Sequence, residues 1–292
     1  MPELGRSSAS RRWRAAGAIT AALAVCAAGA VWIEAPVIGA GGLLHPSRHK
    51  TVVAPPDRCA DATFDGAGIT LRGWRCTTAV PRRGTIVYLH GVADNRGSAS
   101  GIIQRFLQRG FDVVAYDSRA HGDSGGDACT YGFFEKQDLR RVVDTVAGPI
   151  LLIGSSLGGA VALQEAADDP RVRAVVAAET FSDLRTVATD RASGYFPGPI
   201  IDRAFAVAEM QGQFHVDAVS PERAASRITA PVLLIHGDAD VDTPPAHSER
   251  VYAALRGPKR LILVPGARHN GSLTPPVWRE VENWLDQVIP KS

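Results

Sequence analysis

Several common signatures are missing from this sequence of 292 residues, and each absence removes a class of function. The net charge is only +2, from 32 basic and 30 acidic side chains, so no excess of positive charge indicates a nucleic-acid surface. No Gly-x-x-x-x-Gly-Lys phosphate loop and no Gly-x-Gly-x-x-Gly dinucleotide fingerprint occurs. No cysteine and histidine cluster has zinc spacing, so the sequence predicts catalysis without a cofactor or metal.

An apolar segment near the amino terminus is the first feature that is present. Four arginines precede an uncharged run at 15–33, close to the roughly 20 residues that a helix needs to cross a bilayer. Because the arginines precede the run and Glu34 follows it, the chain is expected to begin on the cytoplasmic side of the membrane and to continue outside the cytoplasm. Residues 1–44 are thus predicted to be an amino-terminal membrane anchor. A signal peptide cleaved near Ala28-Gly29-Ala30, which would leave a secreted or periplasmic protein, is the alternative.

Two of the four cysteines flank a predicted hairpin. Short strands are expected at 62–64 and 69–71, with a turn at 65–68. In that register Cys59 and Cys76 face each other, and a cross-strand disulfide is within reach. A disulfide would suit an exported protein. Two free thiols remain the alternative, because the register of a hairpin can slip.

The remaining chain alternates apolar strands with amphipathic helices. Strands are expected at 85–89, 111–116, 149–153, 172–177, 232–235 and 260–264. This order predicts an α/β fold with a mostly parallel sheet, helices on both faces and function at the carboxyl ends of the strands. The alternation breaks at about 181–227, which is expected to be a small helical cap. Residues 45–292 are therefore predicted to form one domain with a cap insertion.

A Gly-x-Ser-x-Gly turn joins the third of these parallel strands to the helix that follows it. Its sequence is Gly154-Ser155-Ser156-Leu157-Gly158. Such a turn holds the central serine in a strained conformation at the end of the strand, and the two glycines leave no side chain to clash with it. The pattern therefore predicts that Ser156 is a nucleophile.

A serine nucleophile needs a base and an acid, and both follow later strands. Asp240 comes just after one strand and His269 just after the next, so the order is Ser, Asp, His, as this type of turn requires. Asp238 and Asp242 compete with Asp240 for the acid role. Glu179 and Asp183, past another strand, are further alternatives. The acids at 238, 240, 242 and 249 also match a calcium loop, although Thr243 replaces its glycine.

The sequence resembles the α/β-hydrolase superfamily over residues 54–292. The resemblance is carried by the segments 90–92 (His-Gly-Val), 154–158, 236–240 (His-Gly-Asp-Ala-Asp) and 266–269 (Gly-Ala-Arg-His). It implies that Ser156 is the nucleophile, His269 the general base and Asp240 the acid that orients it. It also implies an oxyanion hole formed by the backbone N–H groups of Val92 and Leu157. A looser similarity to membrane-anchored Bem46-type and serine aminopeptidase-like hydrolases suggests general acyl-ester chemistry.

The predicted function is therefore a serine hydrolase that cleaves carboxylic esters through an acyl-enzyme. A peptidase, a thioesterase or another acyl-transfer enzyme with the same three residues is the first alternative. A noncatalytic envelope protein that keeps the scaffold for binding is the second. The predicted partners are a small ester or acyl substrate and, through the amino-terminal segment, the membrane.

Overall fold

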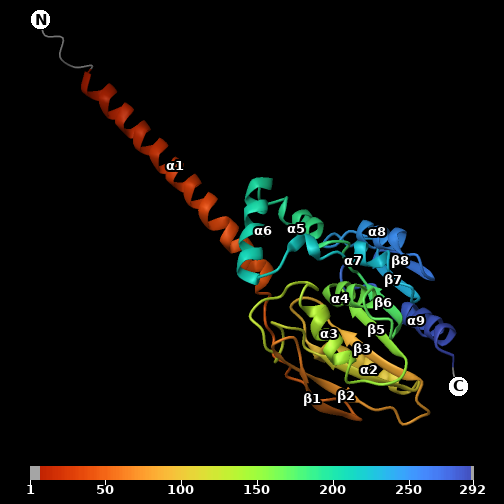
Figure 1. The fold of residues 1–292 in the computed structure, drawn as a ribbon. Coiled ribbons are helices and arrows are strands. Elements are labelled where there is room, and N and C mark those ends of the chain that lie inside the picture. Colours follow the sequence, from red (N-terminus) through yellow and green to blue (C-terminus); the bar gives the residue numbers. More distant parts are fainter. Residues whose placement is uncertain (1–6, 291–292) are drawn as a thin grey trace, which may run out of the picture.

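A computed structural model describes residues 7–290 and places an eight-stranded sheet at the centre of the molecule (Figure 1). The strand order is β1-β2-β4-β3-β5-β6-β7-β8. The strands are β1 (Cys59–Asp65), β2 (Thr70–Cys76), β3 (Gly84–Leu89), β4 (Phe111–Tyr116), β5 (Ile150–Ser155), β6 (Val172–Ala178), β7 (Val232–Gly237) and β8 (Lys259–Val264). From β4 to β8 all neighbours are parallel, whereas β2 runs antiparallel to both β1 and β4. The expected mostly parallel α/β sheet is confirmed.

Helices cover both faces of this sheet because successive strand residues point to opposite sides. In β3, Val87 and Leu89 join the core under one set of helices, and Ile86 and Tyr88 join the core on the other face. The first set is α3 (Glu135–Val143), α4 (Leu157–Ala166), α7 (Pro221–Ala225) and α8 (Ala246–Ala254). The second set is α2 (Ser100–Leu107), preceded by the short 3-10 helix η1 (Arg96–Ala99), and α9 (Pro275–Val288).

The hairpin β1–β2 forms the antiparallel edge of the sheet. Cys59 pairs with Cys76 and Phe64 with Leu71, which is the register expected from the sequence. The disulfide between Cys59 and Cys76 is formed. Phe64 and Leu71 are buried, and burial of one face of a strand is what specifies its register.

The segment between β6 and β7 carries four helices, at the place where the sequence predicts a cap. They are α5 (Leu184–Ala192), α6 (Gly198–Gly212), the 3-10 helix η2 (Val216–Ala218) and α7. Asp183 starts α5, because its carboxylate accepts the N–H of Thr186 at 2.8 Å. Figure 1 shows α5 and α6 beside the body of the sheet, next to the end of the long first helix.

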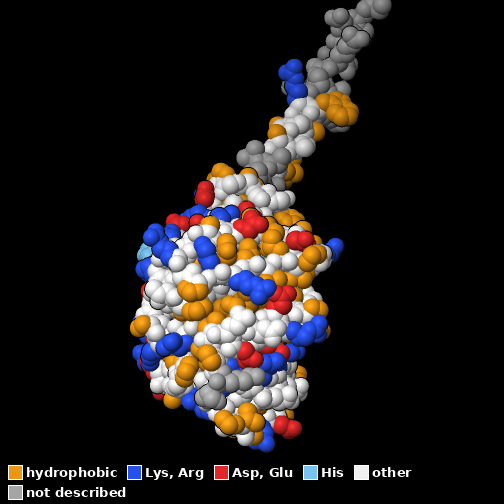
Figure 2. Space-filling view, turned by 90° about the vertical axis from the view of Figure 1, so that its right-hand side faces the viewer, with side chains coloured by type: hydrophobic (Ala, Val, Ile, Leu, Met, Phe, Trp, Pro, Cys, Tyr) orange, Lys and Arg blue, Asp and Glu red, His pale blue; other side chains and the backbone are white. Residues whose placement is uncertain are grey.

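That first helix, α1 (Ser7–Leu44), projects away from the body (Figures 1 and 2). Its last turns pack on α6, and Ala40 and Leu44 are buried there. Among the residues that the structure describes, no helix has the length and apolarity needed to cross a membrane. The anchor or signal segment expected over 1–44 lies partly outside the described residues, since residues 1–6 and several side chains of α1 are not described.

Charged side chains of both signs are interspersed on the face of the body shown in Figure 2. This distribution agrees with the small net charge of the sequence. No broad single-sign surface is visible on that face.

Candidate active site

The turn between β5 and α4 has the strained geometry that the sequence predicts. Ser156 has φ 49° and ψ −113°, a conformation that side-chain-bearing residues seldom adopt. A Cβ on Gly154 would lie 2.3 Å from the carbonyl carbon of Gly158, and one on Gly158 would lie 2.1 Å from the carbonyl oxygen of Leu89. Both positions therefore require glycine, and the close packing fixes Ser156 at the carboxyl edge of the sheet.

The three residues expected to form a catalytic triad lie together at that edge. The Nε2 atom of His269 is 3.2 Å from Oγ of Ser156, and its Nδ1 atom is 2.6 Å from Oδ2 of Asp240. Because the carboxylate can only accept, Nδ1 carries the proton and Nε2 has a lone pair directed at the serine. Asp240 and Ser156 are buried, and they follow β7 and β5 respectively.

The carboxylate of Asp240 is held by several donors. Its Oδ1 atom accepts the N–H groups of Asp242 at 3.0 Å and Thr243 at 2.9 Å. Its Oδ2 atom also lies 3.3 Å from Nε2 of His236, a ring that is fixed by Ser248 at 2.6 Å. These contacts keep the carboxylate aimed at His269.

The competing acids have other partners. Asp238 accepts the N–H of Gly266 at 2.6 Å, and Asp183 caps α5. Asp240, and not Asp238, Asp183 or Asp242, is the acid that contacts the ring of His269. Within residues 7–290, no group of three or more histidine, cysteine or acidic side chains is arranged to hold a metal ion, including the acids at 238–249.

Glu179 has a role that the sequence did not indicate. It adopts φ 53° after β6, and its buried carboxylate accepts the N–H of Asn270 at 2.6 Å and of Ser272 at 2.8 Å. The expectation that it could supply the acid of the triad is wrong, because its oxygens hold the backbone that follows His269. No local motif marks this function, since both partners are backbone groups from a distant loop.

A hollow of about 670 Å³ opens over Ser156 and His269. Its remaining lining comes from the end of β3 and the segment after it up to η1, the end of β5, the cap, and the loops after β6, β7 and β8: Tyr88, Gly91, Val92, Ala93, Asp94, Ser98, Ser155, Glu179, Arg191, Asp242, Asn270 and Leu273. Val92, expected to donate to an oxyanion, is thus in the wall of this hollow. Leu157, the other expected donor, is the first residue of α4, where backbone N–H groups have no partner within the helix.

His90 supports the loop that carries Val92. Its Nδ1 atom lies 2.7 Å from the carbonyl oxygen of Gly91, and its Nε2 atom accepts the N–H of Ser118 at 3.0 Å. Burial, reinforced by the neighbouring His121 ring, lowers the pKa of His90 to about 4. This histidine is therefore neutral and hydrogen-bonded to loop backbone.

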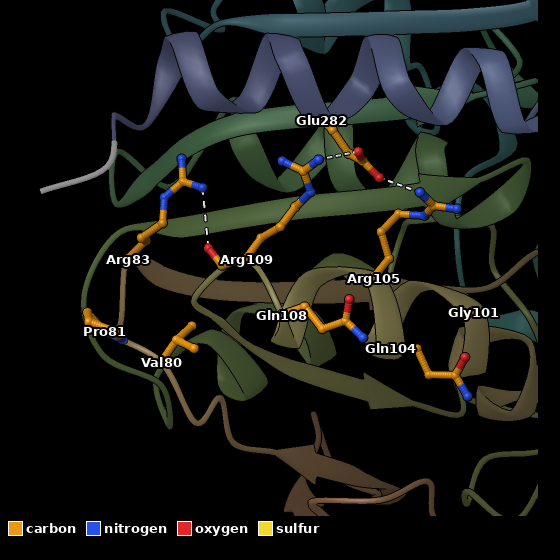
Figure 3. A pocket seen from close by; sticks show the side chains of 9 residues that line it. All are labelled: Val80, Pro81, Arg83, Gly101, Gln104, Arg105, Gln108, Arg109 and Glu282. Atoms are coloured by element: carbon orange, nitrogen blue, oxygen red, sulfur yellow. Dashed lines mark hydrogen bonds and ion pairs between the residues drawn. The ribbon is translucent and has the colours of Figure 1, made fainter.

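A second, larger hollow of about 900 Å³ lies between α2 and α9 (Figure 3). Arg105 and Arg109 there both point toward Glu282 and pair with its carboxylate. Arg83 bonds the carbonyl oxygen of Arg109 at 3.3 Å and the carboxylate of Asp286 at 2.7 Å. The charged side chains of this second hollow thus pair with one another or with Asp286, and no residue of the candidate triad is among its lining residues.

Family profiles match two overlapping parts of the chain. The profile described as serine aminopeptidase, S33, matches residues 80–198, and the prolyl oligopeptidase family profile matches residues 145–291. Together with the sheet order and the serine turn, these matches define the class of protein. The chain belongs to the α/β-hydrolase superfamily.

The chain is also similar to individual proteins and solved structures. The chain is 32% identical to the uncharacterized protein YqkD of Bacillus subtilis over 65% of its own length and 66% of that protein. It is 30% identical to the uncharacterized protein YfhR of Escherichia coli O157:H7 over 69% of its length and 70% of that protein. Among solved structures, the esterase Pf2001 of Pyrococcus furiosus superposes with a TM-score of 0.69 at 22% identity, covering 85% of this chain and 98% of the esterase. The structural likeness shows the fold.

Proposed function

We propose that this protein is a serine hydrolase that cleaves carboxylic esters through an acyl-enzyme intermediate. The observation that carries the proposal is the chain of contacts from Ser156 through His269 to Asp240, at 3.2 Å and 2.6 Å, in the wall of an open hollow. A strained serine beside an imidazole whose other nitrogen is held by a carboxylate is the arrangement that activates a hydroxyl for acyl transfer.

In this mechanism His269 accepts the proton of Ser156 as Oγ adds to the ester carbonyl. The negative charge of Asp240 stabilises the imidazolium that forms. The backbone N–H groups of Leu157 and Val92 are assigned to the oxyanion, and loss of one such donor typically raises the barrier by about 3 kcal/mol. His269 then protonates the leaving alcohol, and water, deprotonated by the same imidazole, releases the acid.

Ester hydrolysis is supported by the name of the Pyrococcus furiosus structure, which is an esterase. Peptide hydrolysis is a second candidate because both matching family profiles are named for peptidases. One feature of the hollow fits it, since the carboxylates of Asp94 and Asp242 line the same cavity as Ser156 and could pair with a substrate amine.

Two measurements on the purified chain test this proposal. A fluorophosphonate probe is expected to form one covalent adduct, found by mass spectrometry on the peptide that contains Ser156. A panel of p-nitrophenyl esters, aminoacyl anilides and acyl thioesters is expected to show the highest kcat/KM for the esters. Folded protein that neither reacts with the probe nor hydrolyses any of these substrates would favour a noncatalytic binding protein.

We also propose that the domain works outside the cytoplasm. The disulfide between Cys59 and Cys76 supports this location, because such bonds persist in oxidising compartments. Alkylation of free thiols in intact cells, before and after reduction, tests it. Cys59 and Cys76 are expected to react only after reduction, whereas reaction beforehand would place the domain in a reducing compartment.

A further inference from the structure

An apolar cavity of about 320 Å³ lies where the end of α1 meets the cap helices. Its described lining is almost entirely hydrophobic, with Leu43 from α1, Val187 and Ala188 from α5 and Ile201 and Phe205 from α6, and Arg191 carries a charge. A concave site of this kind suits an apolar ligand, and its volume is near the lower end of the ~300–1,000 Å³ usual for small-molecule sites.

One wall of this cavity comes from α1. A Cβ on Gly39 would lie 3.2 Å from Cβ of Ala204 in α6, so small residues bring the two helices close together. Gly42 also lines the cavity, and a Cβ there would meet no atom within 4 Å. The space beside Gly42 is therefore open, and a larger side chain can be introduced at this position of the cavity wall without a steric clash at its Cβ.

The apolar cavity adjoins the hollow over Ser156 at Arg191, which lines both. The guanidinium of Arg191 is held by the loop that carries Asp240, through the carbonyl oxygen of Asp242 at 2.8 Å and the hydroxyl of Thr243 at 2.8 Å. Arg191 is therefore held in a fixed position between the apolar cavity and the hollow over Ser156.

We propose that the apolar cavity binds the unbranched acyl chain of the ester whose carbonyl reacts with Ser156, and that α1 is a structural part of this substrate site. The proposal rests on the proposed ester hydrolysis. The apolar lining recognises methylene groups, and the adjoining position lets a chain extend past Arg191 while its carbonyl stays at the nucleophile. The end of α1 would thus take part in substrate selection.

The chain-length dependence of kcat/KM tests this site. For p-nitrophenyl esters from acetate to dodecanoate, each methylene that enters the cavity is expected to raise kcat/KM about fourfold, which corresponds to about 0.8 kcal/mol. Gly42→Leu places a side chain in the open space and is expected to lower the ratio of kcat/KM for the octanoate to kcat/KM for the acetate at least tenfold. Ala188→Leu narrows the same cavity from α5 and is expected to act in the same direction.

Gly41→Leu is the matched control. Gly41 is the neighbouring residue of α1, a Cβ there also meets no atom within 4 Å, and it does not line the cavity. It is therefore expected to keep the wild-type ratio of octanoate to acetate hydrolysis. An unchanged ratio in Gly42→Leu and Ala188→Leu would overturn the proposal.

Direct binding separates this inference from the proposed function. Dodecanoate is expected to raise the melting temperature of the Ser156→Ala protein and to have no effect once Gly42→Leu is added. If the wild type hydrolyses acetate but dodecanoate binds equally well with and without Gly42→Leu, the acyl site lies elsewhere. If dodecanoate binding depends on Gly42 and no ester is hydrolysed, the apolar site stands and the ester hydrolase proposal fails.

Discussion

Among the described residues, the candidate triad is not the only Ser–His–Asp set. A second set joins Ser182, His247 and Asp190, and a third joins Ser248, His236 and Asp240. The first and second sets differ in how the imidazole ring is oriented. In the first, Nε2 of His269 faces Ser156 and Nδ1 faces Asp240. In the second, Nδ1 of His247 lies 2.9 Å from Oγ of Ser182, and its Nε2 atom lies 3.4 Å from a carboxylate oxygen of Asp190. The same three residue types are thus joined in reversed order around the ring.

The second set is saturated with donors. The N–H of Ser182 points to Nδ1 of His247 at 3.2 Å, and a guanidinium nitrogen of Arg250 lies 2.7 Å from the same atom. Arg250 also donates to Oγ of Ser182 at 2.8 Å, and the Ser182 hydroxyl donates to Asp183 at 2.9 Å. With its lone pair already engaged, Nδ1 cannot act as the base for this serine.

The two serines also differ in backbone conformation and in access to solvent. Ser156 sits at φ 49° in the wall of an open hollow, whereas Ser182 is fully buried. The comparison teaches that residue types and mutual distances do not make a catalytic triad. A free lone pair aimed at the hydroxyl, and a path for the substrate, are also required.

The largest predicted effect comes from replacing each of the two serines by alanine. Ser156→Ala removes the nucleophile and is expected to lower kcat for p-nitrophenyl butyrate about 10⁴-fold or more. Ser182→Ala is expected to leave kcat within about threefold, and to cost about 1–2 kcal/mol of unfolding free energy because donors around it lose a partner. Steady-state kinetics and urea unfolding of both proteins check this. A comparable loss of activity in the two variants would show that the second set takes part in the reaction.

The next largest difference in kcat is expected between variants of the two aspartates, Asp240 and Asp190. Asp240→Asn removes the charge beside His269 and disturbs its tautomer, so kcat is expected to fall about 10³–10⁴-fold. Asp190→Asn, at the partly exposed end of the second set, is expected to change kcat by less than threefold. Kinetics at constant pH distinguish the two. Near-normal activity of Asp240→Asn would remove this aspartate from the triad.

The pH dependence of stability should depend on His247. Burial first, and then the positive charge of Arg250, lower the pKa of His247 to about 4, against the attraction of Asp190 and Asp183. Because the unfolded histidine takes up its proton near pH 6.5, stability is complete above that pH and falls as the pH drops toward 4. Between pH 7 and pH 4, the free energy of unfolding of His247→Gln, measured with urea, is expected to fall by about 2 kcal/mol less than that of the wild type. Equal losses would contradict the assignment.

The smallest predicted effect concerns how each histidine is held. His247 lies on α8, whereas His269 lies in a loop whose next residues are bonded by Glu179. Glu179→Gln replaces one acceptor by a donor and is expected to lower kcat/KM about tenfold, because the imidazole is then less well positioned. Asp183→Asn, the matched acid that caps α5, should leave kcat/KM within twofold while lowering stability slightly. Wild-type kinetics of Glu179→Gln would argue that the loop needs no such support.

Short-range patterns account for what could be predicted. The strand at 111–116 matches β4, and the hairpin register follows from the alternation of buried residues such as Phe64 and Leu71. Ser156 was identified because a strained turn needs glycine at 154 and 158, a requirement visible in the sequence. Helix ends were less predictable. α3 ends at Val143 although apolar residues continue at helical spacing to Val146, because the N–H groups of Thr145 and Val146 bond carbonyl groups three residues back instead of four.

Contacts between distant segments could not be predicted. Glu179 bonds backbone 91 and 93 positions further along the chain, and Ser182 meets His247 across 65 positions. The meeting of α1 with α6 around the apolar cavity depends on small residues at Gly39 and Ala204, which carry no signature in isolation. Arg191 also lacks a motif, although it lines both cavities.

Local sequence patterns are enough to specify the alternation of strands and helices, the hairpin register and the order Ser156, Asp240, His269 along the chain. Each of these depends on periodicity or on the steric needs of one short turn, which neighbouring residues supply. The packing of distant segments settles which acid faces His269, that Nδ1 of His247 is already engaged beside Ser182, and that the end of α1 lines an apolar cavity. The physical reason is that hydrogen-bond direction and cavity shape arise where segments far apart in the chain pack together.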